Sequence, residues 1–150
     1  ARTAHEEGLE NVAFLRTRID FIGSFFDRDE VDELWITFPD PQEKLRRRKK
    51  RLTGASFLNR YRQFLKDGGR VHLKTDNKSL YLDTLALVTY NKLLLEKKSD
   101  DIYREDWNDE TVSIQTYYEK RFLEEGLPIT YLCFRLPVHQ EILDLPDEIE

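Results

Sequence analysis

Apolar runs and amphipathic segments alternate along the 150 residues of this chain. Apolar runs bounded by proline or glycine predict strands near residues 12–15, 33–38, 70–75 and 129–136. Apolar positions at helical spacing predict helices over 19–26, 57–65, 80–95 and 115–125, after a first helix that ends at Gly8. The predicted strands are continuously apolar, which is typical of a mostly parallel sheet covered on both faces. The pattern therefore predicts an α/β fold with three layers.

Length and composition fit one folded domain. A chain of 18.0 kDa is long enough for one hydrophobic core and short for two, so we expect residues 1–150 to form a single domain. Aromatic residues make up 12% of the chain, which argues against a disordered protein. No apolar run reaches the roughly 18 residues of a membrane span, and the N-terminal residues carry no secretory signal pattern. We therefore expect a cytoplasmic protein without a membrane segment.

Cysteine and histidine give little support to metal or disulfide chemistry. The single Cys133 excludes an intramolecular disulfide and a cysteine metal cluster. The histidines His5, His72 and His139 lack the spacing of a metal site. We expect no metal site, and we expect Cys133 to be a buried thiol because it lies in an apolar run.

Although the net charge of the chain is −5, one segment is strongly basic. Residues 44–51 read KLRRRKKR, with seven positive charges in eight positions. A solvated loop or a nuclear localisation signal would also account for such a run. However, seven like charges repel one another, and phosphates would offset that repulsion. The run therefore favours a nucleic-acid partner.

Two carboxylates directly follow predicted strands. Asp40 lies in the segment Phe38-Pro-Asp-Pro41, and Asp76 lies in Lys74-Thr-Asp-Asn77. Open α/β sheets bind their ligands beyond the carboxyl ends of the strands, so both residues are candidate site residues. Two structural alternatives remain: the proline-flanked segment is a rigid turn, and Asp76 caps the next helix.

One segment resembles a known family. Residues 38–52, FPDPQEKLRRRKKRL, resemble the FPDPWxKxRHxKRR signature of the bacterial tRNA (guanine-N7)-methyltransferases. The family's tryptophan is replaced by Gln42. Shorter matches follow in the family's order: Gly68-Gly69, Lys74-Thr-Asp76 and Thr116-Tyr-Tyr-Glu119. With the opening segment 4–11, the resemblance covers nearly the whole chain.

The resemblance implies a class I (Rossmann-like) methyltransferase sheet and the cofactor S-adenosylmethionine. It also implies methylation of N7 of a guanosine in the tRNA variable loop, so the expected partner is tRNA. It makes Asp40 the catalytic residue, adjacent to the cofactor, and places Arg18 near the cofactor's adenine, where the family usually has Asp-Ala instead of Arg18-Ile19. The implied substrate-binding residues are Lys44, Asp76, Thr116, Tyr117, Tyr118 and Glu119. The implied contacts to the RNA backbone are Arg46, Arg48, Lys49, Lys50 and Arg51.

The resemblance also concerns the extent of the chain. The family's Gly-rich cofactor loop and the acidic residue after its second strand would precede Ala1. We therefore expect residues 1–150 to be the carboxyl-terminal two thirds of a longer chain and to be inactive alone. A noncatalytic RNA-binding module that uses the same basic run is the alternative function. A Gly-rich loop upstream would favour the enzyme over the module. A homo-oligomer also remains open.

Overall fold

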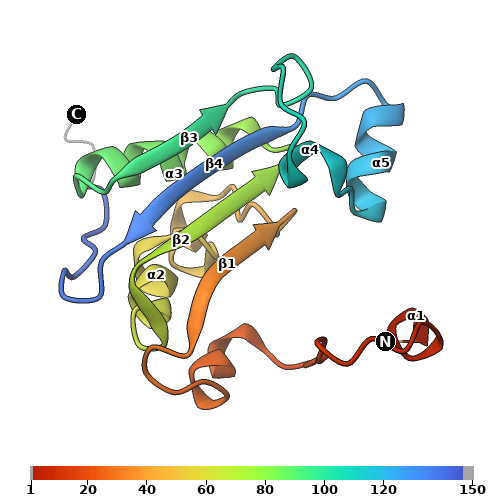
Figure 1. The fold of residues 1–150 in the computed structure, drawn as a ribbon. Helices are drawn as coiled ribbons and strands as arrows, with labels where there is room; N and C mark the ends of the chain where they lie inside the picture. The colour runs from red at the N-terminus through yellow and green to blue at the C-terminus, as the bar shows by residue number, and fades with distance from the viewer. Residues whose placement is uncertain (1, 147–150) are drawn as a thin grey trace.

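The computed structural model describes residues 2–146, and it contains a single four-stranded sheet. Residue 1 and residues 147–150, which complete the predicted domain, lie outside the described residues. The sheet has the order β1-β2-β4-β3 (Figure 1). The strands are β1 (Val31–Thr37), β2 (Leu65–Thr75), β3 (Leu95–Ser99) and β4 (Thr130–Leu136). The α/β class and three of the four predicted strands are confirmed.

The sheet is mixed, which corrects the expectation of mostly parallel neighbours. β1 and β2 run parallel, whereas β4 is antiparallel to both β2 and β3. A continuously apolar strand shows that both of its faces are covered but does not fix its direction. β4 is almost entirely buried because one hydrophobic cluster covers Leu132 and Phe134 and the other covers Tyr131 and Cys133, and this produces the same pattern.

The helices cover the two faces of the sheet unequally. They are α1 (Arg2–Glu6), α2 (Ala55–Tyr61), α3 (Lys78–Tyr90), α4 (Glu110–Ser113) and α5 (Tyr117–Glu124), with 3₁₀ helices η1 (Ile19–Ser24) and η2 (Leu45–Lys50). α2 and α3 pack on one face around the main core, which includes Leu58, Phe64 and Phe134 (Figure 1). A smaller cluster around Ile102 and Ile129 covers the other face. The expected third layer is therefore only partial among the described residues. None of these helices is long and apolar enough to cross a membrane.

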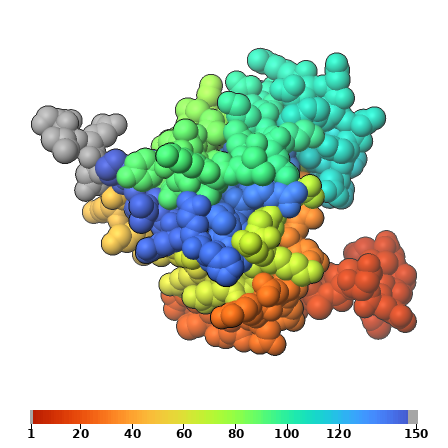
Figure 2. Space-filling model, turned by 60° about the vertical axis from the view of Figure 1, so that its left-hand side comes forward, coloured from red at the N-terminus to blue at the C-terminus, as the bar shows by residue number. Residues whose placement is uncertain are grey.

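The predicted strand at residues 12–15 is absent. This stretch is extended chain within an arm that projects from the body of the molecule (Figures 1 and 2). Its apolar side chains are exposed, with Phe14 exposed to 65%. A strand needs a hydrogen-bonded neighbour, and no described strand pairs with this stretch. The prediction of a strand at residues 12–15 is therefore wrong for the described structure, because an apolar run alone does not supply a hydrogen-bonded neighbour.

β3 replaces the end of a helix that was predicted to reach residue 95. α3 ends at Tyr90, and Lys92 has a φ of +56°, which turns the chain back toward the sheet. The apolar residues of the turn continue the helical spacing, so periodicity does not mark the boundary. β3 itself reads LEKKS, a polar sequence that suits an edge strand.

The predicted turn at Gly68-Gly69 lies inside β2. The β1–β2 register shifts between Val31 and Glu33, and the extra residues of β2 include both glycines. At Gly69, a Cβ atom would lie only 2.9 Å from the carbonyl oxygen of Asp32. Glycine is required there because the two backbones approach closely.

Candidate functional site

The two candidate carboxylates lie at the same end of the sheet. Because β1 and β2 are parallel, with Thr37 in register with Lys74, the chain leaves both strands at one edge. The amide of Phe38 extends this pairing by donating to the Lys74 carbonyl oxygen at 2.8 Å. Asp40 and Asp76 therefore follow neighbouring strand ends, as the sequence predicted.

Asp40 is exposed and held in one orientation. Its Oδ1 accepts a hydrogen bond of 3.0 Å from the backbone N–H of Gln42. Phe38 and Gln42 both have positive φ angles, +49° and +48°, which are uncommon for residues other than glycine. The loop thus combines the predicted rigid turn with a solvent-accessible carboxylate. The rigid-turn interpretation and the functional one are compatible.

Asp76 is partly buried, and it does not cap the following helix. Burial raises the pKa of its carboxyl group above the ordinary value, and the negative charge of Glu125 adds to the increase. The cap of α3 is Asn77, whose side chain accepts from the Leu80 N–H at 2.8 Å. The capping alternative for Asp76 is therefore wrong.

The loops that follow β1 and β2 are joined directly. The side-chain amide of Asn77 donates to the carboxylate of Glu43 at 2.8 Å. Glu43 follows Asp40 in the first loop, and Asn77 follows Asp76 in the second. Neither residue was singled out from the sequence, because a contact between two loops leaves no local pattern.

The basic run forms the 3₁₀ helix η2 with its flanking residues. The exposed residues of the run are Lys44, Arg46, Arg47, Lys49 and Lys50. Arg48 and Arg51 instead turn toward the protein, where Arg48 pairs with Asp144 at 3.3 Å and Arg51 with Asp83 at 3.0 Å. The run therefore divides into an exposed basic surface and two paired arginines. The RNA contacts that the resemblance implies for these basic residues stay predictions.

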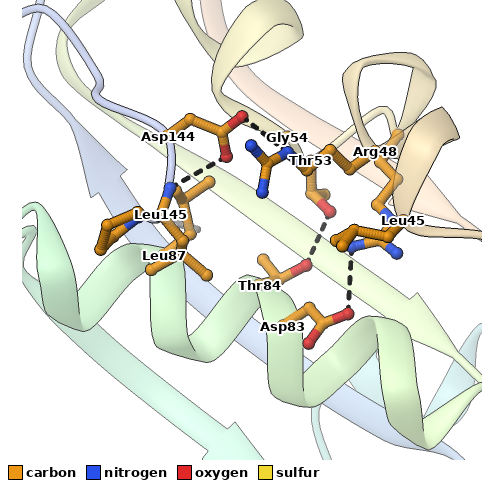
Figure 3. Close-up of a pocket in the computed structure, with 11 residues that line it drawn as sticks. Leu45, Arg48, Thr53, Gly54, Asp83, Thr84, Leu87, Asp144 and Leu145 are labelled. Carbon is orange, nitrogen blue, oxygen red and sulfur yellow. Dashed lines mark hydrogen bonds and ion pairs between the residues drawn. The ribbon is translucent and has the colours of Figure 1, made fainter. Parts of the chain in front are cut away.

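A cavity of about 630 Å³ lies between η2, α3 and the chain near Asp144 (Figure 3). The two ion pairs of the arginines line it. A third polar pair joins the hydroxyl groups of Thr53 and Thr84, which are 2.7 Å apart (Figure 3). Leucine side chains, including Leu87, complete the lining. The polar side chains of this cavity thus attach η2 to α3 and to the C-terminal segment.

Glu119 and Lys74 form a buried ion pair beside the predicted site. The ammonium of Lys74 lies 2.8 Å from Oε2 of Glu119, and both side chains are buried. Lys74 also donates to the carbonyl oxygens of Thr111 and Ile114. Tyr103 donates its hydroxyl hydrogen to the other carboxylate oxygen, Oε1. The Glu119 carboxylate is thus directed into the protein, and its contact with a substrate stays a prediction.

The other residues of the Thr116–Glu119 motif have separate roles. Thr116 caps α5, since its hydroxyl oxygen accepts from the Glu119 N–H at 3.2 Å. Tyr117 and Tyr118 are 73% and 58% exposed, and their ring centroids are 5.8 Å apart. Two exposed aromatic rings suit base stacking, and that role stays a prediction.

Arg18 lies on the projecting arm, and its side chain is exposed. It pairs with Asp20 at 3.4 Å and lies over the ring of Phe21. Among the described residues, no hydrogen bond or ion pair joins Arg18 to Asp40 or Asp76, and its cofactor role stays a prediction. Elsewhere, Cys133 is buried as predicted, and burial raises its pKa to about 11. Within residues 2–146 no cluster of metal-ligating side chains is found.

Comparison with known proteins gives a consistent result. The model of a family described as "Putative methyltransferase" matches residues 1–132. The chain is 47% identical over 146 residues to a tRNA (guanine-N(7)-)-methyltransferase of Bacteroides thetaiotaomicron, covering 97% of the chain and 57% of the relative. It is 49% identical over 137 residues to that of Porphyromonas gingivalis, covering 91% and 55%. The chain therefore spans little more than half the length of these relatives. The family match confirms the expected methyltransferase type of sheet.

Proposed function

Since this chain belongs to the methyltransferase family whose model matches residues 1–132, we propose that it acts in the transfer of a methyl group from S-adenosylmethionine to N7 of a guanosine in the tRNA variable loop. The observation that carries the proposal is the placement of Asp40. Its oriented, exposed carboxylate lies at the end of β1, beside the end of β2 and next to the basic surface of η2. We also propose that residues 1–150 belong to one domain, and that the protein works in the cytoplasm, where its tRNA substrate is found.

This methyl transfer requires little chemical activation of the base by the protein. N7 of guanine carries an in-plane lone pair, so no strong base is required. When bound, S-adenosylmethionine supplies an electrophilic methyl group on a positively charged sulfur. The protein must orient the base toward that methyl group and stabilise the positive charge that develops on the base. An oriented carboxylate fits both requirements, because it attracts positive charge and accepts hydrogen bonds.

Asp40 is the residue proposed to bind the guanine. The Watson–Crick edge of guanine presents two N–H donors, and a carboxylate accepts both with its two oxygens. That edge becomes accessible only after the base leaves its stack. Asp76, in the neighbouring loop, provides a second acceptor when it is ionised. The hydrogen bond from Gln42 keeps the Asp40 carboxylate in place before the RNA arrives.

The RNA backbone is proposed to bind the exposed part of η2. The side chains of Lys44, Arg46, Lys49 and Lys50 face solvent and would contact phosphates. Such contacts position an RNA without reading its sequence. Tyr117 and Tyr118 at the start of α5 offer rings for an unstacked base. Phosphate contacts on η2 would thus position the RNA, whereas contacts at the strand ends would bind the base.

The decisive experiment replaces Asp40 in the full-length protein. Asp40→Ala should remove most methyl transfer to tRNA, because the guanine loses its acceptor, while tRNA affinity stays within a few-fold of wild type. Asp106→Ala is the matched control, since Asp106 is also an exposed aspartate and lies away from both loops in sequence. Methylation of N7 is measured by cleavage at the modified guanosine, and affinity by filter binding. Activity of Asp40→Ala close to wild type would contradict the role of Asp40.

The exposed basic surface alone is also consistent with a noncatalytic RNA-binding module. The same measurements separate the two functions. Wild-type protein that binds tRNA tightly and transfers no methyl group, with cofactor present, would support the module.

A further inference from the structure

The side chain of Arg51 forms hydrogen bonds with the loop that carries Asp40. Its Nε donates to the carbonyl oxygen of Gln42 at 3.1 Å, and a terminal nitrogen donates to that of Glu43 at 3.3 Å. The other terminal nitrogen donates to the Asp83 carboxylate at 3.0 Å. The side chain is only 12% exposed. All three guanidinium nitrogens therefore have protein acceptors, and little of the group is left for a phosphate.

We infer that Arg51 is a positioning residue, which holds the Asp40 loop in its active conformation, and is not a contact to the RNA backbone. The inference rests on the proposed function, because it assigns Arg51 to the same reaction. The path from Arg51 to Asp40 is short. Arg51 fixes the carbonyl group of Gln42, and the N–H of the same residue orients Asp40.

The backbone of Gln42 explains why such a support is needed. Its φ of +48° is sparsely populated for a residue with a side chain, and a conformation of this kind persists only where its surroundings stabilise it. The two hydrogen bonds from Arg51 to consecutive carbonyl groups provide that stabilisation. Without them, the loop is free to leave the turn that orients Asp40.

Arg51 also sets the position of the loop relative to Asp76. Asp83 belongs to α3, the helix that begins directly after Asp76 and Asn77. Figure 3 shows Asp83 on α3 at the edge of the cavity, with its ion pair drawn. The Glu43–Asn77 hydrogen bond is a second attachment to the start of the same helix. The loop is thus fixed to α3 at two points. These attachments fix the position of Asp40 relative to Asp76.

Lysine cannot replace arginine in this arrangement. A guanidinium is a planar fork with five N–H groups, whereas an ammonium is a single charged point on a flexible stem. Arg51→Lys therefore keeps the charge of the run but loses the simultaneous contacts with two carbonyl groups and a carboxylate. Lys50 is the natural comparison, because it is adjacent, exposed and equally charged.

The test compares Arg51→Lys with Lys50→Ala in the full-length protein. Arg51→Lys should lower kcat by between about tenfold and a hundredfold, as small misplacements of catalytic groups do. Its KM for tRNA and the salt dependence of tRNA binding should stay unchanged. Lys50→Ala should instead raise the KM for tRNA and reduce the salt slope, because it removes an exposed charge proposed to contact phosphate. Asp83→Asn should lower kcat, and the double variant Arg51→Lys/Asp83→Asn should lose less than the product of the single losses.

A weaker tRNA affinity and a smaller salt slope in Arg51→Lys, with kcat unchanged, would overturn the inference. Hydrogen exchange of the Gln42 amide tests the same point without activity. Exchange at Gln42 should accelerate about tenfold or more in Arg51→Lys and remain unchanged in Lys50→Ala. If wild-type protein does not methylate tRNA, the proposed function fails, and the exchange measurement still decides whether Arg51 holds the loop. Equal exchange in the two variants would exclude a positioning role.

Discussion

The ammonium of Lys74 and the carboxylate of Glu119 are 2.8 Å apart, and both lie inside the protein. Lys74 is the last but one residue of β2, and Glu119 lies in the first turn of α5. The pair therefore attaches α5, with its two exposed tyrosines, to the end of the sheet where Asp76 follows. A buried charge pair contributes little when intact, but a buried charge without its partner is costly.

Breaking this pair should destabilise the fold strongly. Glu119→Gln leaves the Lys74 ammonium buried without a counter-charge, so the free energy of unfolding should fall by about 3–5 kcal/mol. Urea unfolding followed by circular dichroism measures the change. Glu124→Gln, at an exposed position of the same helix, is the control and should stay within about 0.5 kcal/mol of wild type.

The double variant Lys74→Met/Glu119→Leu tests the cause. It removes both charges, so it should be more stable than Glu119→Gln, although the carbonyl oxygens of Thr111 and Ile114 lose a donor. A Glu119→Gln variant as stable as Glu124→Gln would contradict the importance of the pair.

The fold was predictable from sequence where the local pattern carried the information. The continuous apolar runs of β1, β2 and β4 mark buried strands, and prolines mark the end of β1. The pattern failed where neighbours decide the outcome. The polar edge strand β3 lacks an apolar run, and residues 12–15 have the run but no described strand beside them.

The site divides in the same way. Asp40 and Asp76 were predictable because each directly follows a strand, and parallel strands place such residues together. The contacts that position them were not predictable. Lys74 belongs to a short motif in the sequence, but its partner Glu119 is remote from it along the chain. Arg51 cannot be distinguished by sequence from the other charges of the basic run. Side-chain partners across long sequence separations leave no periodic signal.

Neutralising the exposed basic surface should weaken RNA binding without affecting the fold. In Arg46→Gln/Lys49→Gln/Lys50→Gln, the log–log slope of tRNA affinity against salt should decrease by about 0.7–0.9 per lost phosphate contact. Filter binding over a range of salt concentrations measures the slope. The melting temperature should not fall, because these three side chains are exposed.

A matched variant controls for net charge. Arg16→Gln/Arg28→Gln/Lys92→Gln removes the same number of positive charges from other exposed positions. Its salt slope should stay near that of wild type. If both triple variants change the slope equally, the effect comes from net charge, and η2 does not contact RNA.

The raised pKa of Asp76 predicts a stability that depends on pH. Burial disfavours the ionised carboxylate, so the pKa of Asp76 is higher in the folded state than in the unfolded chain. The stability that the neutral carboxyl provides is present below the unfolded pKa and is lost as pH rises through the folded pKa. Asp76→Asn should therefore be more stable than wild type at pH 7, and the difference should shrink as the pH is lowered toward 4.

Urea midpoints measured between pH 4.5 and pH 8 decide this, with Asp106→Asn as the exposed control. The control should show a pH-independent difference from wild type. An Asp76→Asn variant that is less stable than wild type at pH 7 would mean that the ionised carboxylate has a stabilising partner. That result would contradict the expectation that burial of the charge lowers stability.

The exposed apolar arm predicts self-association of the 150-residue chain. Val12, Phe14 and Leu15 are exposed, and contiguous exposed apolar side chains favour contacts between molecules. β1 adds to this tendency, because it pairs only with β2 among the described strands and leaves one edge open. The purified chain should therefore show a mass that rises with concentration in light scattering. Phe14→Ser/Leu15→Ser should lower that mass. Leu94→Ser/Ile114→Ser, which removes two apolar side chains of similar or greater exposure elsewhere, should not. A wild-type chain that stays monomeric at every concentration, or an equal effect of the two double variants, would show that the arm does not drive association.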